Sequence, residues 1–264
     1  MRRRRRGIGD KTGTFVSTWQ TDNAGTSGAT QITLPLEASG DYDFGINWGD
    51  GTSDTITAYD QVLAGESVAV THTYPIAGTY TVKIDGLING WRFNYGGDRR
   101  KITDISQWGD LLIGNSGYYF WGCYNLNVSA TDVLDVSSVT NFTYAFFECT
   151  SLTTLDVSNW DVSNVTTFYG AFNNCSSLDG LDISGFDLTE LTNAADMLGG
   201  VTISNYSDVL IAWGAQATAG TIQSTLIMPF SAGTNTYSGA AAIAAKAALK
   251  AAPYNWDISD GGEE

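Results

Sequence analysis

The chain has 264 residues, of which 43% are hydrophobic and only 16% are charged, and its net charge is −15. A chain this apolar can bury a core, which excludes global disorder, and no apolar run is long enough for a transmembrane helix. One His and three Cys cannot form a His-rich zinc site or a Cys-x-x-Cys cluster, so we expect no metal and no cofactor.

The charge is divided unevenly along the chain. Residues 1–11 carry six basic residues and one acidic residue, a net charge of +5, whereas the remainder carries seven basic and 27 acidic residues, a net charge of −20. The acidic body argues against nucleic acid as a partner, because its binding needs clustered Lys and Arg. We expect the basic tail to dock on an acidic partner surface; a solvated tail and a nucleic-acid arm stay open as alternatives. The docking residues are Arg2, Arg3, Arg4, Arg5 and Arg6.

The basic start is not followed by the apolar segment that a secretory signal needs. Because the sequence begins with Met1, we expect a protein that leaves its cell without such a signal. Release by lysis, as part of a virus particle, fits this expectation.

Residues 14–90 alternate apolar and polar side chains in short runs separated by turns, which predicts an antiparallel β-sandwich. The expected strands lie at 31–36, 42–48, 68–74 and 79–85. The run Asn-Trp-Gly-Asp-Gly-Thr at 47–52, followed by His-Thr-Tyr at 72–74 and Gly-Thr-Tyr-Thr-Val at 78–82, resembles the PKD-like immunoglobulin fold. In that pattern His72 is structural rather than a general base, and we expect Asp50 to cap a turn.

A 26-residue period follows this region. Cys123, Cys149 and Cys175 mark it at equal spacing, and apolar and polar columns beside them keep the same step. One such unit cannot bury its own apolar face, so successive units must stack as coils. The coils cover 113–138, 139–164 and 165–190, and a fourth at 191–204 keeps the repeat pattern only in part. A connector at 91–112 precedes the first coil.

Several features inside the coils have two interpretations. The runs at 152–158 and 178–184 alternate and predict strands of a parallel sheet. The odd number of cysteines favours buried reduced thiols over disulfides. The repeated Asp residues fit backbone hydrogen bonds in each turn better than a ladder of calcium sites.

The remaining segment, 205–264, predicts a small helical C-terminal cap. A short helix is expected at 206–216, and an Ala-rich helix at 238–252 has Ser238 as its N-cap and Pro253 as its stop. Residues 1–13 form the Arg-rich tail.

The repeats at 139–152 and 159–165 and the closing run at 255–262 resemble the BspA-like leucine-rich-repeat surface proteins. The resemblance implies a mainly β protein, with a PKD-like β-sandwich, a short leucine-rich-repeat solenoid and the helical cap. Members of that family are cell-surface adhesins or proteins of bacteriophage particles without known enzymatic chemistry.

We therefore expect a non-enzymatic virion structural protein on the particle surface: a fibre, a decoration protein or a tail attachment protein. It would dock to capsid, neck or tail proteins and display its solenoid for host attachment, without inserting into a membrane. A bacterial cell-surface adhesin is the alternative, and a carbohydrate-active enzyme is a second one, because acidic pairs are plentiful. No P-loop or nucleophile elbow occurs. A homo-oligomer stays open.

Aromatic residues indicate where binding would occur. A cluster in the first coil is expected to contact a host glycan or receptor, because stacked aromatic side chains can hold sugar rings. Packing between the sandwich and the solenoid is the alternative. The cluster consists of Tyr118, Tyr119, Trp121 and Tyr124, and Trp91, Phe93 and Tyr95 lie just before it.

Overall fold

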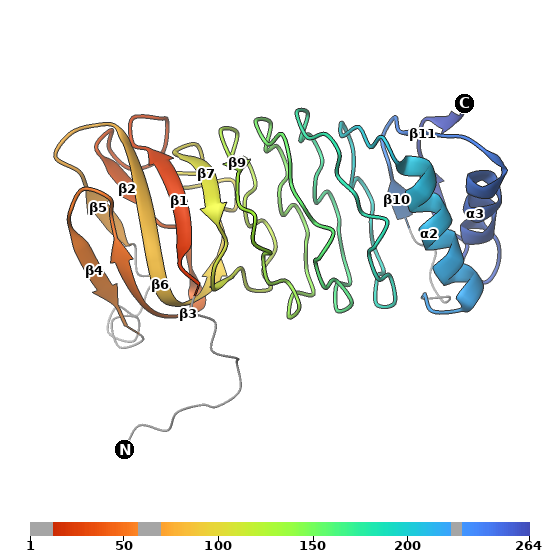
Figure 1. Cartoon of the computed structure of the whole chain (residues 1–264), viewed down its shortest axis with the longest axis horizontal. Helices are drawn as coiled ribbons and strands as arrows, with labels where there is room; N and C mark the ends of the chain where they lie inside the picture. Colours follow the sequence, from red (N-terminus) through yellow and green to blue (C-terminus); the bar gives the residue numbers. More distant parts are fainter. Residues whose placement is uncertain (1–12, 58–69, 223–228) are drawn as a thin grey trace, which may run out of the picture.

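The computed structural model describes residues 13–57, 70–222 and 229–264. The protein is mainly β with few helices, as the sequence predicts. It is elongated, with a β-sheet region at one end, a stack of coils in the middle and two helices at the other end (Figure 1). One continuous cluster of buried apolar residues extends from Phe15 to Ile258.

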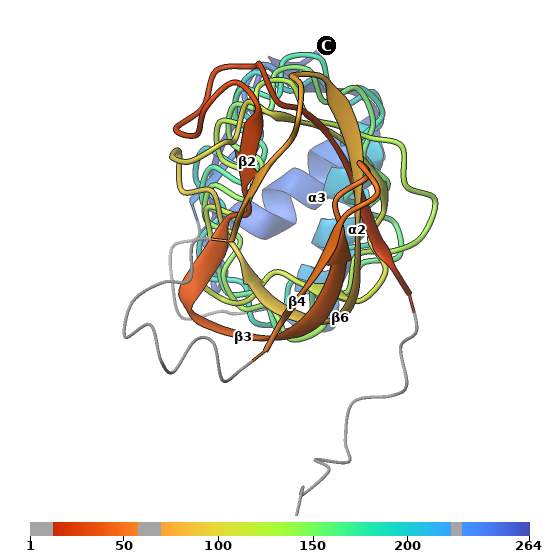
Figure 2. The same cartoon turned by 90° about the vertical axis from the view of Figure 1, so that its left-hand side faces the viewer.

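The N-terminal region is built on a seven-stranded sheet with the order β4-β3-β6-β1-β7-β9, in which β8 pairs with β6. Its neighbours are antiparallel except for the pairs β6–β8 and β7–β9. A second sheet pairs β2 (Gln31–Thr33) with β5 (Thr71–Thr73), and along the long axis β2 lies across the molecule from β6 (Figure 2). The strands of the large sheet are β1 (Phe15–Gln20), β3 (Leu36–Asn47), β4 (Ser53–Ile56), β6 (Thr79–Trp91), β7 (Ile102–Gln107), β8 (Leu111–Leu112) and β9 (Asn127–Val128).

Alternation explains most of these strands. In β1, Phe15, Ser17 and Trp19 point inward, which is the period of two that a strand requires. The expected strand at 79–85 is confirmed inside the longer β6, and the one at 42–48 is confirmed inside β3 except for Trp48, which follows its end. The expected strand at 31–36 stops at Thr33, since Pro35 has no N–H to donate to a neighbouring strand.

The fourth expected strand is shorter than predicted, and the structure adds two strands that the sequence did not indicate. Of the run predicted at 68–74, Thr71–Thr73 forms a strand, and residues 68 and 69 lie outside the described part of the chain. The strands β1 and β4 were not predicted.

Strand β7 joins the sheet to the coils. It pairs antiparallel with β1 on one side and parallel with β9, a segment of the first coil, on the other. Asp104 faces Asn127 and Ile105 faces Val128 in this parallel pair. The N-terminal sheet therefore continues into the stack without a flexible linker.

The coils are connected by backbone hydrogen bonds between residues 25 positions apart. The N–H groups of Tyr118, Tyr144 and Gly170 donate to the carbonyl oxygens of Thr143, Tyr169 and Ala195, at 2.7, 2.9 and 2.9 Å. The ladder continues beyond the repeats, because Ala194 bonds to β10 (Pro229–Ser231) and β10 pairs in parallel with β12 (Asp257–Ser259).

The predicted strands at 152–158 and 178–184 are wrong: these residues form turns and irregular segments. The reason is that Asp156 and Asp182 accept the backbone N–H of Ser158 and Ser184, two residues on, which bends the chain. The prediction that the repeated Asp residues bond turn backbones is thereby confirmed. In the described residues, no group of His, Cys, Asp and Glu is placed to hold a metal ion.

Columns of apolar side chains fill the inside of the stack. The rings of Phe120 and Phe146 stack at 5.1 Å, and those of Phe146 and Phe172 stack at 5.9 Å. The three cysteines are free and buried, which confirms the prediction of reduced thiols.

The C-terminal region covers the far end of the stack. Helix α2 (Tyr206–Ala219) is longer than the predicted 206–216 and ends at Gly220, whose φ of 72° is left-handed. Ser238 does not cap the second helix: α3 (Ala240–Lys250) begins after Gly239, and no side chain caps it. In the part of the chain that the structure describes, no helix is long and apolar enough to span a bilayer. The remaining strands, β11 (Thr236–Tyr237) and β13 (Gly262–Glu263), pair in parallel.

Candidate ligand-binding surface

Aromatic and arginine side chains from the connector and the first three coils lie together on one part of the surface. The connector supplies the arginines and one tyrosine, and the coils supply the other rings. We call this group the aromatic–arginine surface. It consists of Arg92, Tyr95, Arg99, Arg100, Tyr118, Trp121, Tyr124, Tyr144, Phe147 and Tyr169.

Its rings follow the direction in which the coils stack. The ring centroids of Tyr95 and Trp121 are 4.8 Å apart, those of Trp121 and Tyr144 are 5.4 Å apart, and those of Tyr144 and Tyr169 are 5.1 Å apart. Tyr118 and Tyr144 occupy one position of the 26-residue repeat, so the ladder places one above the other, 5.5 Å apart. Gly170 occupies the same position in the third coil, where the aromatic column ends.

The backbone under these rings has a left-handed conformation. Tyr118 and Tyr144 have φ values of 60° and 51°, and Gly170 and Asp196 continue the column at 61° and 55°. For a residue with a side chain this conformation costs roughly 1–2 kcal/mol, and such residues concentrate at functional sites. The strain is repeated because each coil needs the same bend.

Two glycines make room for the side chains of the surface. A Cβ atom on Gly170 would lie 2.3 Å from the ring of Tyr144. A Cβ atom on Gly122 would lie 2.7 Å from the ring of Tyr95 and 2.8 Å from Nε of Arg99. Only glycine at these positions lets the rings lie directly on the backbone.

Each arginine lies over a tyrosine ring. The guanidinium carbons of Arg92, Arg99 and Arg100 are 5.0, 4.3 and 4.9 Å from ring centroids of Tyr118, Tyr95 and Tyr124, respectively. These distances are those of cation–π contacts.

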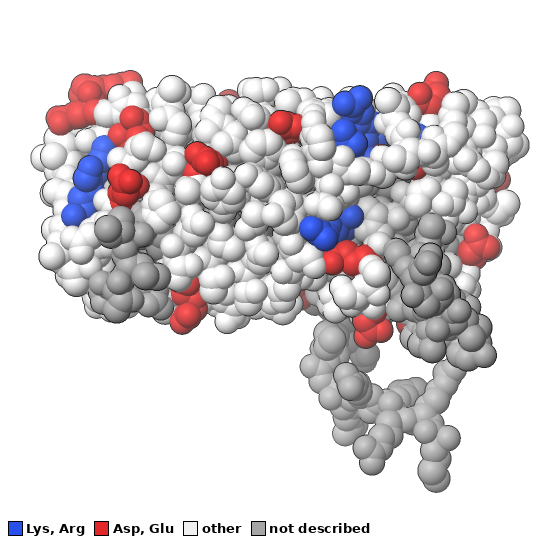
Figure 3. Space-filling view, turned by 180° about the vertical axis from the view of Figure 1, so that it is seen from behind, with Lys and Arg blue, Asp and Glu red and all other residues white. Residues whose placement is uncertain are grey.

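The same arginines have no carboxylate partner. Within the described residues the ion pairs join His72 to Asp50, Lys101 to Asp98 and Lys246 to Asp260, and none includes an arginine. Lys and Arg side chains gather where the sheet meets the coils and near the C-terminal helices (Figure 3).

Four of the phenol groups of the surface, those of Tyr95, Tyr124, Tyr144 and Tyr169, are hydrogen-bonded. The hydroxyl oxygens of Tyr95 and Tyr124 are 2.9 Å apart, and Tyr124 donates to Glu148 at 2.7 Å. Burial and these two neighbours raise the pKa of Tyr124. A hydrogen bond with Tyr169, followed by burial, raises the pKa of Tyr144 to about 12. At neutral pH both phenols are therefore uncharged.

The structure brings three of the four predicted coil residues together. Tyr118, Trp121 and Tyr124 lie in the aromatic–arginine surface, half-buried, beside the exposed Tyr95. Tyr119 does not: it is fully buried, and its hydroxyl lies 2.8 and 2.7 Å from the carbonyl oxygens of Gly114 and Asn141. It points into the core, as does the next residue, Phe120, which is also fully buried.

Other predicted residues lie elsewhere. Trp91 and Phe93 belong to the core, at 0% and 4% exposure. The docking residues Arg2, Arg3, Arg4, Arg5 and Arg6 lie outside the described residues.

Sequence reasoning missed the part of the surface in the second and third coils. Tyr144 and Phe147 stand one repeat after Tyr118 and Trp121, so the repeat itself carried the signal. Gly122 and Gly170 could not be recognised, because their importance depends on contacts between coils.

His72 and Asp50 form a separate cluster in the N-terminal region. His72 Nε2 is 2.8 Å from Asp50 Oδ2, and its ring stacks on Trp48 at 4.6 Å. Asp50 also accepts hydrogen bonds from the backbone and hydroxyl of Thr52. Burial raises the pKa of Asp50, but the hydrogen bonds from Thr52 and His72 outweigh it and bring the pKa to about 2. The carboxylate caps the 49–52 turn, as predicted.

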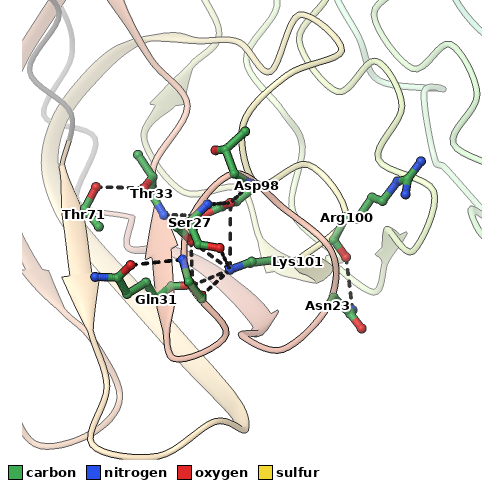
Figure 4. Close-up of polar contacts among 10 residues, drawn as sticks. Asn23, Ser27, Gln31, Thr33, Thr71, Asp98, Arg100 and Lys101 are labelled. Atoms are coloured by element: carbon green, nitrogen blue, oxygen red, sulfur yellow. Dashed lines mark hydrogen bonds and ion pairs between the residues drawn. The ribbon is translucent and has the colours of Figure 1, made fainter.

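A buried pair holds the start of the coils against the N-terminal sheet. Lys101 and Asp98 are both completely buried, and Figure 4 shows their side chains meeting inside the loop that contains Ser27. Lys101 Nζ donates at 2.8 Å to Ser27 Oγ and to the carbonyl oxygens of Gly28 and Gln31. Burial lowers the pKa of Lys101, and Asp98 opposes this effect. The pair is a structural clamp.

Residues 93–213 match a family model described as "Mycoplasma protein of unknown function, DUF285". The matched segment contains the coils and the larger part of the aromatic–arginine surface. No curated protein and no solved structure matches the chain.

Proposed function

We propose that the chain is a non-enzymatic structural protein of a bacteriophage particle, a fibre, decoration or tail attachment protein, whose coils bind the host surface. The observation that carries this proposal is the aromatic–arginine surface. It presents half-buried rings and guanidinium groups without a carboxylate partner on a stack fixed by backbone hydrogen bonds. Rigid aromatic residues and arginines are the side chains that dominate recognition surfaces.

Two more detailed proposals concern the fold of the N-terminal region and of the coils. We propose that the N-terminal region is a PKD-like immunoglobulin sandwich, supported by its two sheets and by the turn capped by Asp50. We also propose that the coils are leucine-rich repeats of the BspA type, supported by the 26-residue columns of Phe and Cys. Such a solenoid displays side chains at fixed intervals.

Docking to the particle is assigned to Arg2, Arg3, Arg4, Arg5 and Arg6. The support is the charge contrast between this run and the acidic remainder of the chain. A variant lacking residues 2–6 should be incorporated poorly into particles. Incorporation equal to that of the intact chain would refute docking by the tail.

Host binding is tested with fluorescently labelled protein on cells of the bacterium that propagates the particle. Trp121→Ala should bind far less than the unaltered chain, because Trp121 contacts the rings of Tyr95, Tyr118 and Tyr144. Ile211→Ala, an exposed apolar position on α2, is the matched control and should bind normally. Circular dichroism confirms that both variants fold. Normal binding by a folded Trp121→Ala protein would overturn the proposal.

A bacterial cell-surface adhesin is the second candidate, and one observation favours it: the matching family model is described from Mycoplasma, a cellular organism. The two functions predict different locations for the same binding surface. An antibody against the chain should label purified particles if it is a virion protein, and growing cells without particles if it is an adhesin.

A further inference from the structure

We infer that the aromatic–arginine surface binds an acidic polysaccharide, a polymer whose sugar rings carry carboxylate groups. The inference rests on the proposed host-binding function and adds the chemical class of the ligand. Three features carry it: the spacing of the rings, the arginines that have no carboxylate partner, and the backbone that holds both in place.

The rings form a continuous stacked column along the coils, which we call the track. Tyr95 is 41% exposed, and the adjoining Trp121 and Tyr144 are half-buried, with neighbouring centroids 4.8 and 5.4 Å apart. Neighbouring rings are inclined by 31° and 34°, so they cover one another's faces and leave their edges for a ligand, at intervals comparable with the length of one sugar unit in a chain. A polymer lying along the stacking direction would therefore meet one ring after another.

The arginines define the charge of the ligand. Arg92, Arg99 and Arg100 are all the arginines among the described residues, and all three lie at this one surface. None has a carboxylate partner there, although the chain has 28 acidic residues. In addition, Nε of Arg92 and Nε of Arg99 are buried without a hydrogen-bond partner. A planar guanidinium binds a carboxylate through two parallel hydrogen bonds, which suits it to a uronic acid.

The track is pre-organised. The ring of Tyr95 and the side chain of Arg99 rest on Gly122, and the ring of Tyr144 rests on Gly170. Groups already fixed in place lose little conformational freedom when a ligand binds.

The charge distribution favours a sparsely charged polymer over nucleic acid. The three arginines all belong to the connector, whereas Glu148, which accepts a hydrogen bond from Tyr124, belongs to the second coil. The positive charge is therefore confined to the end of the track nearest the sheet. Nucleic acid carries a phosphate on every nucleotide and is bound through many cationic contacts. The three arginines match occasional carboxylates instead.

The probe is a partly methyl-esterified oligogalacturonate, which carries only occasional carboxylates, compared with the fully methyl-esterified oligosaccharide, which keeps the sugar rings and removes the charge. Isothermal titration calorimetry should show binding of the acid and at least about tenfold weaker binding of the ester, because charge-assisted bonds are lost. The triple variant Arg92→Gln, Arg99→Gln, Arg100→Gln should lose the preference for the acid. Lys83→Gln, which removes one exposed cation from β6, is the charge control and should keep it.

Equal binding of acid and ester, no binding of either, or equally tight binding of single-stranded oligothymidylate would each overturn the inference. The cell-binding assay separates this failure from failure of the proposed function. If Trp121→Ala abolishes cell binding and the triple arginine variant does not, host binding stands and the acidic ligand is refuted. If neither variant affects cell binding, both ideas fail.

Discussion

The thiol of Cys175 donates a hydrogen bond to the carbonyl oxygen of Phe146 in the preceding coil, with Sγ and O 2.9 Å apart. Cys149 makes the same contact with the carbonyl oxygen of Phe120 at 3.2 Å. Each thiol thus reaches back 29 residues. The cysteine column fills space as a small apolar side chain would, and it also satisfies carbonyl groups inside the stack.

The burial of this column predicts that the thiols are unreactive in the folded protein. Cys123, Cys149 and Cys175 are completely buried, and burial raises the pKa of Cys123 and of Cys149 well above the ordinary value. Since the thiolate is the reactive form, a disulfide reagent such as Ellman's should label none of them in buffer and all three in denaturant. Rapid stoichiometric labelling of the native chain would contradict the buried column.

A pair of glycine substitutions tests the contact under Tyr144. Gly170 and Gly180 both have left-handed φ values, 61° and 69°, but a Cβ atom on Gly180 would meet nothing within 4 Å. Gly180→Ala should lower the free energy of unfolding by about 1 kcal/mol through backbone strain alone. Gly170→Ala should cost about 1–3 kcal/mol more, since its methyl group forces the Tyr144 ring to move.

Urea denaturation of the two variants measures this difference directly. Gly170→Ala should also weaken ligand binding, because the displaced ring belongs to the track. Equal stability losses in the two variants would show that the ring does not rest on Gly170.

The Asp50 carboxylate predicts a specific pH dependence of stability. Its pKa in the folded protein is about 2, below the ordinary 3.8. The stabilisation is therefore complete above the ordinary pKa and is lost as the pH falls from there toward 2. At neutral pH, Asp50→Asn should lower the free energy of unfolding by roughly 1 kcal/mol, and the difference from the unaltered chain should vanish near the lower end of this range.

Thermal melts across this pH range provide the measurement. Asp43→Asn on β3 is the control, because Asp43 is an exposed carboxylate of the same sheet. A stability difference for Asp50→Asn that stays constant down to the lowest pH would contradict a charged cap.

Removing the Lys101 ammonium should destabilise the junction between the sheet and the coils. Lys101→Met removes one donor from each of the carbonyl oxygens of Gly28 and Gln31 and leaves Asp98 without its buried counter-charge. Losing one partner of a buried pair costs about 3–5 kcal/mol. Lys83→Met, at an exposed position, should change the free energy of unfolding by less than about 0.5 kcal/mol. Similar effects of the two substitutions in chemical denaturation would rule out the clamp.

Much of the fold follows from periodicity in the sequence. The 26-residue spacing of Cys123, Cys149 and Cys175 predicted stacking and buried thiols, because equivalent positions of a repeat face the same way. The Asp and Ser pairs of the turns predicted hydrogen bonds from the turn backbone to the Asp carboxylates. Such bonds join residues two positions apart, so they can be predicted from the local sequence.

Features that depend on contacts between distant segments could not be predicted. Alternation at 152–158 looked like a strand, but the side chain of Asp156 competes with a neighbouring strand for backbone N–H groups. The last members of the ladder, β10 and β12, are separated from the repeats by α2 and α3, which breaks the 26-residue period. Within the aromatic–arginine surface, the cluster at 118–124 was predicted from its composition, whereas the inward orientation of Tyr119 was not.

The second coil, 139–164, offers the same hydrogen-bonding edge to the third coil as the first coil offers to it. A duplicated copy of this coil could therefore be inserted without any new type of contact. Each insertion would lengthen the rod by one strand spacing, roughly 4.8 Å, while the connector-side rings and arginines kept their places beside the sheet. Gene duplication could thus adjust how far apart the two ends of this molecule are held without redesigning either end.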